Sequence, residues 1–471
     1  MSIVNSYKKL LNNSLIFAIG NLGSKFIVLI LVPLYTYYLT KSEYGLIDLL
    51  TTTISFIVPI ITLSIVDAVL RFAMDHNYDK KEVLINSLMI CLIGFFVLVI
   101  IFPLLKIILP FNKYILYFYL IILSQIIDNT LSQYIRAKEM IRLFAFSGII
   151  NAITLLISNV LLLMVLNKGI TGYLVSIVVS NLVRSLLLLF RANIVKDIHL
   201  DKINISLVKE MLYYSIPLIP NALMWWIMSL SDRYLITYFL GLSANGLYAV
   251  ANKVPSILSI AHSIFFQAWQ MAAIEEVESK DKSQFFSNVF NIFWLTMFIL
   301  TSLLLVFLKL IINVFIAEEY FESWKYIPFL LLGVVFSSFS GFLGVNYIAS
   351  KKTSGVFKTS IIGAVINFIT NILLIPTLGI NGASIATMLS FLVIWLLRIK
   401  DTKDFVIIKI KWKTLWLSFF ILMLQIGVLY VNYSTEFIVE LFLFLSILLV
   451  NIQQIKKILL RYNEPKKLDT K

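Results

Sequence analysis

The stretch SDRYLITYFLGLSANGLYAV, at residues 231–250, decides how the chain is organised. Its second part repeats an earlier stretch, because TYYLTKSEYGLIDL at residues 36–49 shares Thr, Tyr, Leu, Ser, Gly and Leu, in register, with residues 237–250. Two further stretches match in the same order along the chain, residues 134–149 with 347–362 and residues 169–183 with 379–393. Three matches in one order indicate an internal repeat, whose second copy opens with residues 231–250.

The composition is that of a membrane protein. Of the 471 residues, 60% are hydrophobic and 14% are charged, whereas a soluble domain has about 45–50% apolar and about 25% charged residues. Apolar runs long enough to cross a bilayer recur along the chain, and they do not alternate as barrel strands do. We therefore predict an all-α polytopic membrane protein with about fourteen transmembrane helices, since a backbone in lipid must satisfy its own hydrogen bonds. The predicted spans are residues 12–39, 44–71, 85–108, 114–134, 143–166, 170–191, 212–240, 247–269, 286–311, 327–349, 359–376, 379–397, 415–432 and 437–459.

The spacing of the repeat predicts how the helices group. The matched stretches lie six predicted spans apart, and because six is even, both copies enter the membrane in the same direction. We predict two six-helix lobes in parallel repeat, residues 1–191 and 212–397, joined by a cytoplasmic linker at residues 192–211. Residues 398–471 hold two further helices, 13 and 14, and a basic cytoplasmic tail. The linker is polar, as expected of a hinge, and paired lobes typically move by alternating access around a site between them.

The net charge of +14 is explained mainly by topology. Lys and Arg gather in the loops on the side of the N-terminus and are sparse in the opposite loops, which predicts that both termini are cytoplasmic. Some of this charge is expected to attract anionic membrane lipids, and no nucleic-acid partner is predicted. Cys91 is the only cysteine and the histidines are scattered, so neither a disulfide nor a metal site is expected. The chain has no Gly-rich phosphate loop, and no cofactor is predicted.

Two equivalent spans carry polar stripes. Residues Asp48, Thr51, Ser55 and Thr62 share one face of the second span. The equivalent face of the eighth span carries Asn252, Ser256, Ser259, Ser263 and Gln267. Small polar residues also pack helices together in membranes, so the stripes alone leave packing and a wet cavity open.

Ionisable side chains inside the predicted spans favour the interpretation that the polar stripes line a water-filled cavity. A charge deep in a membrane costs about 2.5–3.5 kcal/mol, so it faces a partner or a wet cavity. The cations that lie at least four residues inside the ends of predicted spans are Lys25, Arg184, Arg233 and Lys253. Lys25, one turn after Asn21, and Lys253 have no acid within a helical turn, so both are predicted to line an aqueous cavity.

The remaining charges have structural alternatives. Arg233 lines the cavity, pairs with Asp232 or lies at the outer interface, and Arg184 either lines the cavity or extends to the inner end of its span. Arg71 closes the second span four residues after Asp67, and we expect a local salt bridge between them. The acids that lie at least four residues inside the ends of predicted spans are Asp48, Asp67, Asp128 and Asp232.

This pattern fits an anionic substrate. A phosphate or sugar acid that crosses hydrocarbon needs cations with hydroxyl or amide donors in a water-filled cavity. Trp225 and Trp226 could stack on sugar rings there, or pack against neighbouring helices.

The stretches LYTYYLTKSEYGLIDL (residues 34–49), YIRAKEMIRLFAFSGIINAIT (residues 134–154) and SDRYLITYFLGLSANGLYAVANK (residues 231–253) resemble the polysaccharide biosynthesis family of bacterial exporters. These are the Wzx-type repeat-unit flippases of the multidrug/oligosaccharidyl-lipid/polysaccharide exporter superfamily. The resemblance covers nearly the whole chain. It implies a V-shaped pair of six-helix lobes in the bacterial cell membrane, which moves an undecaprenyl-pyrophosphate-linked oligosaccharide to the outer leaflet without chemical change. The pathway's polymerase and glycosyltransferases are then expected partners.

Two other functions stay open at this stage. A cation-coupled drug antiporter of the same fold would rely on buried carboxylates as its main intramembrane charge, whereas cations match or outnumber acids here. A membrane-embedded polysaccharide polymerase would carry a large loop with catalytic carboxylates. The longest outer loop, residues 312–326, is short, although it holds Glu318, Glu319 and Glu322.

Overall fold

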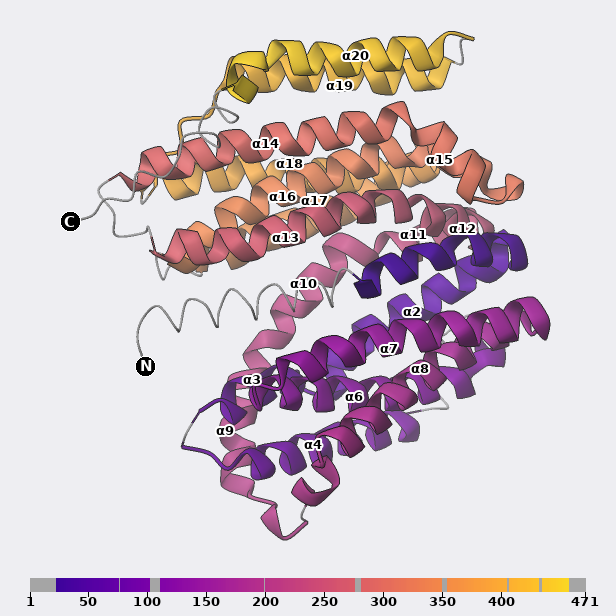
Figure 1. Ribbon diagram of the computed structural model, residues 1–471, viewed down its shortest axis with the longest axis vertical. Coiled ribbons are helices and arrows are strands. Elements are labelled where there is room, and N and C mark those ends of the chain that lie inside the picture. Colours follow the sequence, from indigo (N-terminus) through magenta and orange to yellow (C-terminus); the bar gives the residue numbers. More distant parts are fainter. Residues whose placement is uncertain are drawn as a thin grey trace. The chain divides into compact units, whose positions relative to one another are not determined.

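The computed structural model describes residues 23–75, 77–101, 111–198, 200–275, 281–349, 354–404, 406–431 and 434–456. Within these ranges the regular elements are helices and no strand occurs. The chain divides into two compact units, Met1–Ala249 and Val250–Lys471 (Figure 1). The predicted fold class is confirmed: this is an all-α polytopic membrane protein. The predicted lobe boundaries follow the sequence repeat and stay a prediction.

The first unit contains the helices up to α11 and most of α12. Its first described helix is Gly23–Tyr38. The others are α2 (Lys41–Ile61), α3 (Ile65–Ala73), α4 (Lys80–Ile100), η1 (Asn112–Tyr114), α6 (Ile115–Ala137), α7 (Ile141–Asn159), η2 (Val160–Val165), α8 (Gly169–Arg191), η3 (Ile194–Asp197), η4 (Leu200–Lys202), α9 (Ile205–Ser215), η5 (Ile216–Leu218), α10 (Ile219–Leu230), α11 (Asp232–Leu240) and α12 (Leu242–Ala251). Helix α6 is central, because it packs against α3, α4 and α8.

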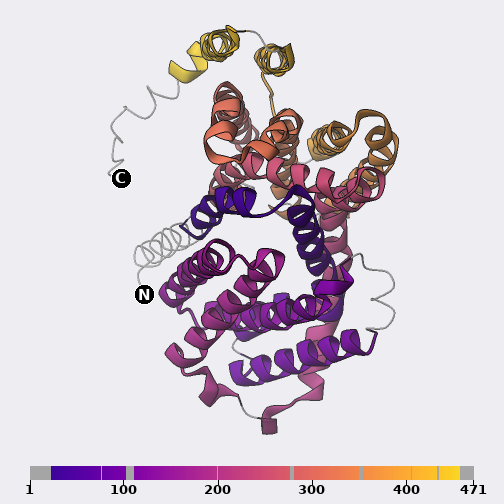
Figure 2. The same cartoon turned by 90° about the vertical axis from the view of Figure 1, so that its right-hand side faces the viewer.

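The second unit is organised around α16 and α18. Its elements are α13 (Lys253–Glu275), α14 (Lys282–Val306), α15 (Leu308–Phe315), η6 (Glu318–Tyr326), α16 (Ile327–Ala349), α17 (Ser354–Leu378), α18 (Ile380–Asp401), η7 (Thr402–Asp404), α19 (Trp412–Val431) and α20 (Glu436–Val450). Helix α18 packs along α16 and α17, while α19 and α20 pack on each other and on α14. Figure 2 shows α19 and α20 nearly end-on.

Eleven helices of the described residues are long and apolar enough to cross a membrane, and each overlaps a predicted span. Three predicted spans are not among them. The span at residues 12–39 begins outside the described residues, and its described part, Gly23–Tyr38, is shorter. The span at residues 437–459 ends outside them, and α20 itself has 15 residues. The span at residues 212–240 is broken into shorter helices.

Prolines explain the first break in that span, between α9 and α10. Pro217 lies in η5 and Pro220 at the start of α10, and a proline lacks the N–H that a continuous helix would use. The predicted span over residues 212–240 is therefore not one continuous helix. These residues form the end of α9, then η5, α10 and α11.

The predicted span at residues 44–71 is also divided. Helix α2 contains Pro59 and ends at Ile61, and α3 starts at Ile65. Between them Leu63 and Ser64 have φ values of 50° and 51°, in the left-handed region that side chains other than glycine rarely adopt. The N–H of Ser64 donates to the carbonyl of Pro59 at 2.9 Å, which closes the turn.

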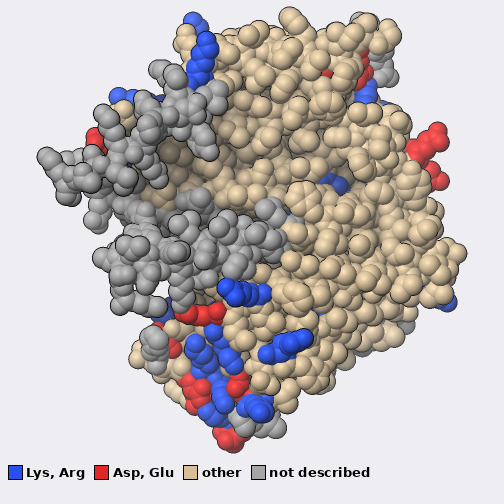
Figure 3. Space-filling view, viewed as in Figure 1, with Lys and Arg blue, Asp and Glu red and all other residues tan. Residues whose placement is uncertain are grey.

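The polar linker at residues 192–211 is bound to the first unit. Asp197 of η3 accepts hydrogen bonds from the Tyr134 hydroxyl at 3.0 Å and from Lys138 at 2.8 Å, and Lys81 lies 3.3 Å away. Further contacts join Asp79 to Lys202, and the Tyr78 hydroxyl to Glu210 at 2.6 Å. In Figure 3 charged side chains of both signs gather over this region, around α4 and α9. The linker is thus docked on the helices of the first unit along its length, which its composition did not predict.

The internal repeat is visible in one of these contacts. Tyr347 aligns with Tyr134 in the repeat, and its hydroxyl donates to Asp401 at 2.7 Å. In each unit, therefore, a tyrosine in the last turn of α6 or α16 donates to an aspartate at the end of α18 or a few residues beyond the end of α8.

Helices α19 and α20 are joined to α14 and α15 by polar contacts at several levels. Ser302 of α14 donates to Gln425 of α19 at 2.6 Å, and Gln425 donates to Glu440 of α20 at 3.0 Å. Lys309 of α15 pairs with Glu436 of α20 at 2.6 Å. In low-dielectric surroundings such bonds hold helices together, since each group would otherwise be unsatisfied.

Candidate functional site

The candidate site lies along α2 within the first unit, where helices α10 and α11 pack against it and α12 contacts it at Gly45. Helix α2 starts with a capping box, in which the Thr40 hydroxyl accepts from the N–H of Glu43 at 3.3 Å and Glu43 accepts from the N–H of Thr40 at 2.9 Å. This cap fixes the end of α2, and Asp48 lies on the second turn after it.

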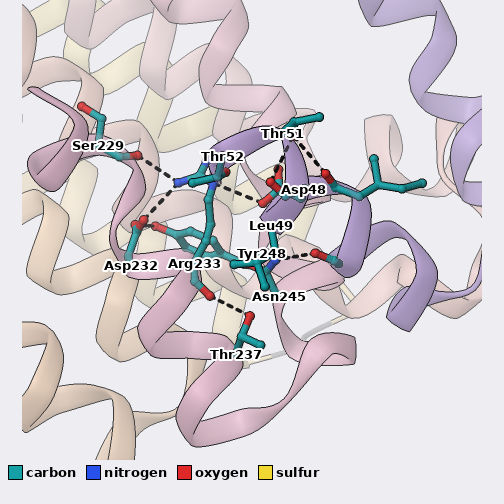
Figure 4. Close-up of polar contacts among 12 residues, drawn as sticks. Asp48, Leu49, Thr51, Thr52, Ser229, Asp232, Arg233, Thr237, Asn245 and Tyr248 are labelled. Atoms are coloured by element: carbon teal, nitrogen blue, oxygen red, sulfur yellow. Dashed lines mark hydrogen bonds and ion pairs between the residues drawn. The ribbon is translucent and has the colours of Figure 1, made fainter. Parts of the chain in front are cut away.

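Arg233 is the centre of the site (Figure 4). Its Nε lies 3.1 Å from Oδ2 of Asp48 on α2, and its Nη1 lies 3.0 Å from Oδ1 of Asp232 on α11. Nη1 also donates to the carbonyl of Ser229 at 2.9 Å. The side chains of Arg233, Asp48 and Asp232 are 9%, 17% and 3% exposed, so this is a buried charge cluster.

Tyr248 completes the cluster from α12. Its hydroxyl contacts the second oxygen of Asp232, and its ring centroid lies 5.5 Å from the Arg233 guanidinium carbon. One guanidinium therefore faces two carboxylates, and the cluster holds one more acid than base. The predicted pairing of Arg233 with Asp232 is confirmed, while the ion pair with Asp48 joins residues far apart in the sequence.

Three further contacts continue this seam along α2. Asn245 of α12 donates to the carbonyl of Gly45 at 2.8 Å. The indole N–H of Trp226 donates to the carbonyl of Thr52 at 3.0 Å, and the Tyr234 hydroxyl contacts the Thr53 hydroxyl. Trp226 is thus engaged in helix packing, whereas Trp225 is 44% exposed.

Lys25 differs from Arg233. It lies on the exposed side of the helix Gly23–Tyr38, and no ion pair joins it to any described residue. Asn21, its predicted neighbour, lies outside the described residues.

Arg184 is held inside the first unit. Its Nη1 lies 2.9 Å from Oδ2 of Asp128 on α6, and its Nε donates to the Ser147 hydroxyl of α7 at 3.3 Å. Its side chain is 15% exposed. The alternative in which Arg184 extends to the end of its helix is therefore wrong, because α6 supplies a buried partner. Its contacts join α6, α7 and α8.

Arg71 lies on the surface, with its side chain 58% exposed, and pairs with Asp75 at 3.1 Å. The expected salt bridge to Asp67 is wrong. Both acids are four residues from Arg71, and Asp75 lies beyond the end of α3, where the chain turns back toward Arg71. Ser55, another predicted site residue, is exposed and its hydroxyl donates to its own helix at the carbonyl of Thr52, at 2.7 Å.

The other predicted residues belong to the second unit. Lys253 is half-buried at the start of α13, and no ion pair joins it to a described residue. The Ser256 hydroxyl donates to the carbonyl of Lys253 at 2.5 Å, and Asn252 is half-buried beside it. The predicted pairing of Lys25 with Lys253 across the lobes stays a prediction.

Sequence reasoning missed one buried cation, Arg398. It is 3% exposed, and it donates to the Thr359 hydroxyl at 3.1 Å, the Ser340 carbonyl at 2.8 Å and the Ser360 hydroxyl at 3.3 Å. It lies one residue past the predicted span at residues 379–397, so an error at the boundary of that span hid it.

Comparisons with known proteins agree on family and fold. A family model described as "Polysaccharide biosynthesis protein" matches residues 10–270. An uncharacterized membrane protein of Methanocaldococcus jannaschii is 34% identical over 175 residues, which are 36% of this chain and 34% of that protein. The chain thus spans about a third of the length of the curated relative it matches.

Two solved structures show the same fold. The lipid II flippase MurJ in an inward closed conformation has a TM-score of 0.69 at 14% identity, over 95% of this chain and 100% of that one. An inward-facing multidrug resistance MATE family transporter of the MOP superfamily has a TM-score of 0.68 at 13% identity, over 81% of this chain and 95% of that one.

Proposed function

Because this chain belongs to the polysaccharide biosynthesis protein family, we propose that it moves a lipid-linked oligosaccharide between membrane leaflets. The proposed substrate is an undecaprenyl-pyrophosphate-linked repeat unit of a surface polysaccharide, carried from the inner to the outer leaflet of a bacterial cell membrane by alternating access. Both termini would lie in the cytoplasm, and the polymerase and glycosyltransferases of the same pathway would be its partners. The substrate would leave chemically unchanged, without a cofactor.

The observation that supports this proposal is the difference between paired and unpaired cations in the membrane. Arg184, Arg233 and Lys309 each have a carboxylate partner, and Arg398 has three oxygen acceptors. Lys25 and Lys253 have no ion pair in the described part of the chain.

An unpaired cation within an apolar helix is costly unless it meets water or an anion. The pyrophosphate of the proposed substrate carries the matching charge, and lysine binds phosphate as a compact cation. We therefore assign Lys25 and Lys253, one from each copy of the repeat, to the attraction of this group.

A second candidate is a cation-coupled antiporter of small molecules. It is favoured by the cluster of Asp48, Asp232 and Arg233, because two carboxylates on one guanidinium leave an acid that a transported cation could neutralise. The fold of a MATE family transporter accommodates this function equally well.

The test uses purified protein in liposomes that contain a fluorescent undecaprenyl-pyrophosphate-linked oligosaccharide. A membrane-impermeant reductant bleaches only the outer leaflet, so movement of the lipid increases the bleached fraction. We expect movement by the parental protein. Lys25→Ala or Lys253→Ala should slow it roughly tenfold, and Lys→Arg should restore part of the rate because the charge remains.

The matched control is Lys196→Ala, at an exposed lysine of η3, which should move lipid at the parental rate. Absence of movement by the parental protein, together with uptake of a cationic drug driven by an ion gradient, would establish the antiporter instead. Unchanged rates in both lysine variants would overturn the assigned site while leaving the flippase function in place.

A further inference from the structure

A short extended segment connects α18 and α19 in the second unit. We call residues 406–413, VIIKIKWK, the basic strap; residues 406–411 are extended, and Trp412 and Lys413 open α19. Its side chains alternate between two faces: Val406 is buried and Ile408 and Ile410 are half-buried, whereas Ile407 and Lys409 are exposed. This is the period of an extended chain with one face on the protein and one face outward.

Helix α14 holds the strap extended. Residues 283, 287 and 291 lie four apart, on one face of α14, and accept hydrogen bonds from alternate N–H groups of the strap. The bonds join Ile407 to Ser283 Oγ at 3.3 Å, Lys409 to Ser287 Oγ at 2.8 Å and Lys411 to Asn291 Oδ1 at 3.0 Å. Asn291 also donates to the carbonyl of Lys409 at 2.9 Å. A polar stripe of α14 thus fixes the register of the strap, and with it the direction of its lysines.

The outward face of the strap is basic and aromatic. Lys409 and Lys413 are exposed, and neither has an acidic partner in the described residues. The Lys411 ammonium donates to Gln454 at 3.0 Å. Trp412 and Trp416, 39% and 45% exposed, stack with ring centroids 6.2 Å apart. Cations beside exposed tryptophans are typical of the boundary between lipid and water.

The position of the strap in the chain also fits the boundary between lipid and water. It lies between two segments that are long and apolar enough to cross the membrane, Ile380–Asp404 and Trp412–Val431, so it lies where both leave the bilayer. Of the acids near it, Asp401 is bound by Tyr347. We propose that the basic strap is a binding surface for the anionic headgroups of glycerophospholipids, with Lys409 and Lys413 on the phosphates and Trp412 at the level of the headgroups.

The test measures which lipid lies next to Trp412. Full-length protein is placed in nanodiscs in which a fixed fraction of the lipid is brominated phosphatidylglycerol or brominated phosphatidylcholine, with no oligosaccharide lipid present. Bromine quenches tryptophan at short range, and the signal of Trp412→Phe is subtracted to isolate Trp412. We expect the anionic lipid to quench roughly threefold more than the neutral lipid at low salt, with the preference decreasing at high salt.

Lys409→Gln with Lys413→Gln should abolish this preference. The matched control, Lys196→Gln with Lys358→Gln, removes the same charge from exposed lysines elsewhere and should keep it. Equal quenching by both lipids in the parental protein would overturn the proposal without any variant. A preference that survives in the Lys409 and Lys413 variant would overturn the assignment to these lysines.

Discussion

Gly45 of α2 and Gly246 of α12, which align in the internal repeat, meet in a reciprocal contact. A Cβ atom on Gly45 would lie 2.0 Å from the carbonyl oxygen of Leu242, and one on Gly246 would lie 1.9 Å from the carbonyl oxygen of Lys41. Lys41 and Leu242 also align with each other in the repeat. Equivalent turns of the two copies thus touch backbone to backbone, which only glycine at both positions allows.

Gly45→Ala and Gly246→Ala should each destabilise the protein. The new methyl group would overlap backbone atoms that cannot rotate away, and overpacking of this kind costs about 1–3 kcal/mol. Thermal unfolding in detergent should show a lower midpoint for both variants. Gly427→Ala is the control, because a Cβ there meets no atom within 4 Å and alanine favours a helix. If both glycine variants melted like the parental protein, the close crossing of α2 and α12 would be wrong.

Arg233→Met should lower the stability of the protein more than Asp48→Asn does. Removing the guanidinium leaves two buried carboxylates without a counter-charge, which costs about 3–5 kcal/mol, whereas Asp48→Asn leaves the pair of Arg233 and Asp232 intact. Thermal unfolding of both variants in detergent checks which of them is less stable. Adding Asp48→Asn to Arg233→Met should recover part of the lost stability. If instead the double variant lost the sum of the two single losses, the two side chains would not interact.

Asp197→Asn should release the linker. Burial alone would raise the pKa of Asp197, but the hydrogen bonds from Lys138 and Tyr134 outweigh it and lower that pKa. The carboxylate therefore stabilises the docked linker at neutral pH, and this contribution is lost as the pH falls through the lowered pKa. Hydrogen exchange of residues 192–211 should become at least about tenfold faster in the variant, from the loss of about 1.5–3 kcal/mol. Lys196→Gln, on the exposed side of η3, should leave this exchange unchanged.

Reporter fusions should reveal the predicted topology. A fusion at Glu319, in η6, should report the outside, and fusions at Lys202 and Lys403 should report the cytoplasm, since the loops rich in lysine and arginine stay inside. Opposite signals at two of these three positions would reverse the assigned orientation.

Much of the fold was accessible from the sequence, because apolar runs and positive-inside loops depend on local composition. The interruptions of the predicted helices could be predicted only in part. Pro217 and Pro220 indicate the interruption before α10, and Pro59 indicates a bend in α2. The left-handed conformation of Leu63 and Ser64 could not be predicted from the sequence, since neither residue type favours it.

The charge pairs were harder to predict, because they depend on helices that approach from far along the chain. Arg184 pairs with Asp128 on another helix, and Arg233 pairs with Asp48 on α2. Arg71 has an acid four residues away on either side, and local spacing cannot choose between Asp67 and Asp75. Lys25 and Lys253 could be singled out from the sequence, because a lysine without any local acid can be recognised from its neighbours alone, and their role in a cavity stays a prediction.

The polar contacts of α19 and α20 have a consequence for how this protein can be shortened. The two helices lie outside the repeat, which makes them look like a dispensable addition to a twelve-helix transporter. A gene cut after α18 would nevertheless leave Ser302 without Gln425, and Lys309 without Glu436, on surfaces newly turned toward lipid. The shortened protein would therefore carry Lys309 without the carboxylate that pairs with it, and any lost activity would report that defect before it reported a role of the missing helices in transport.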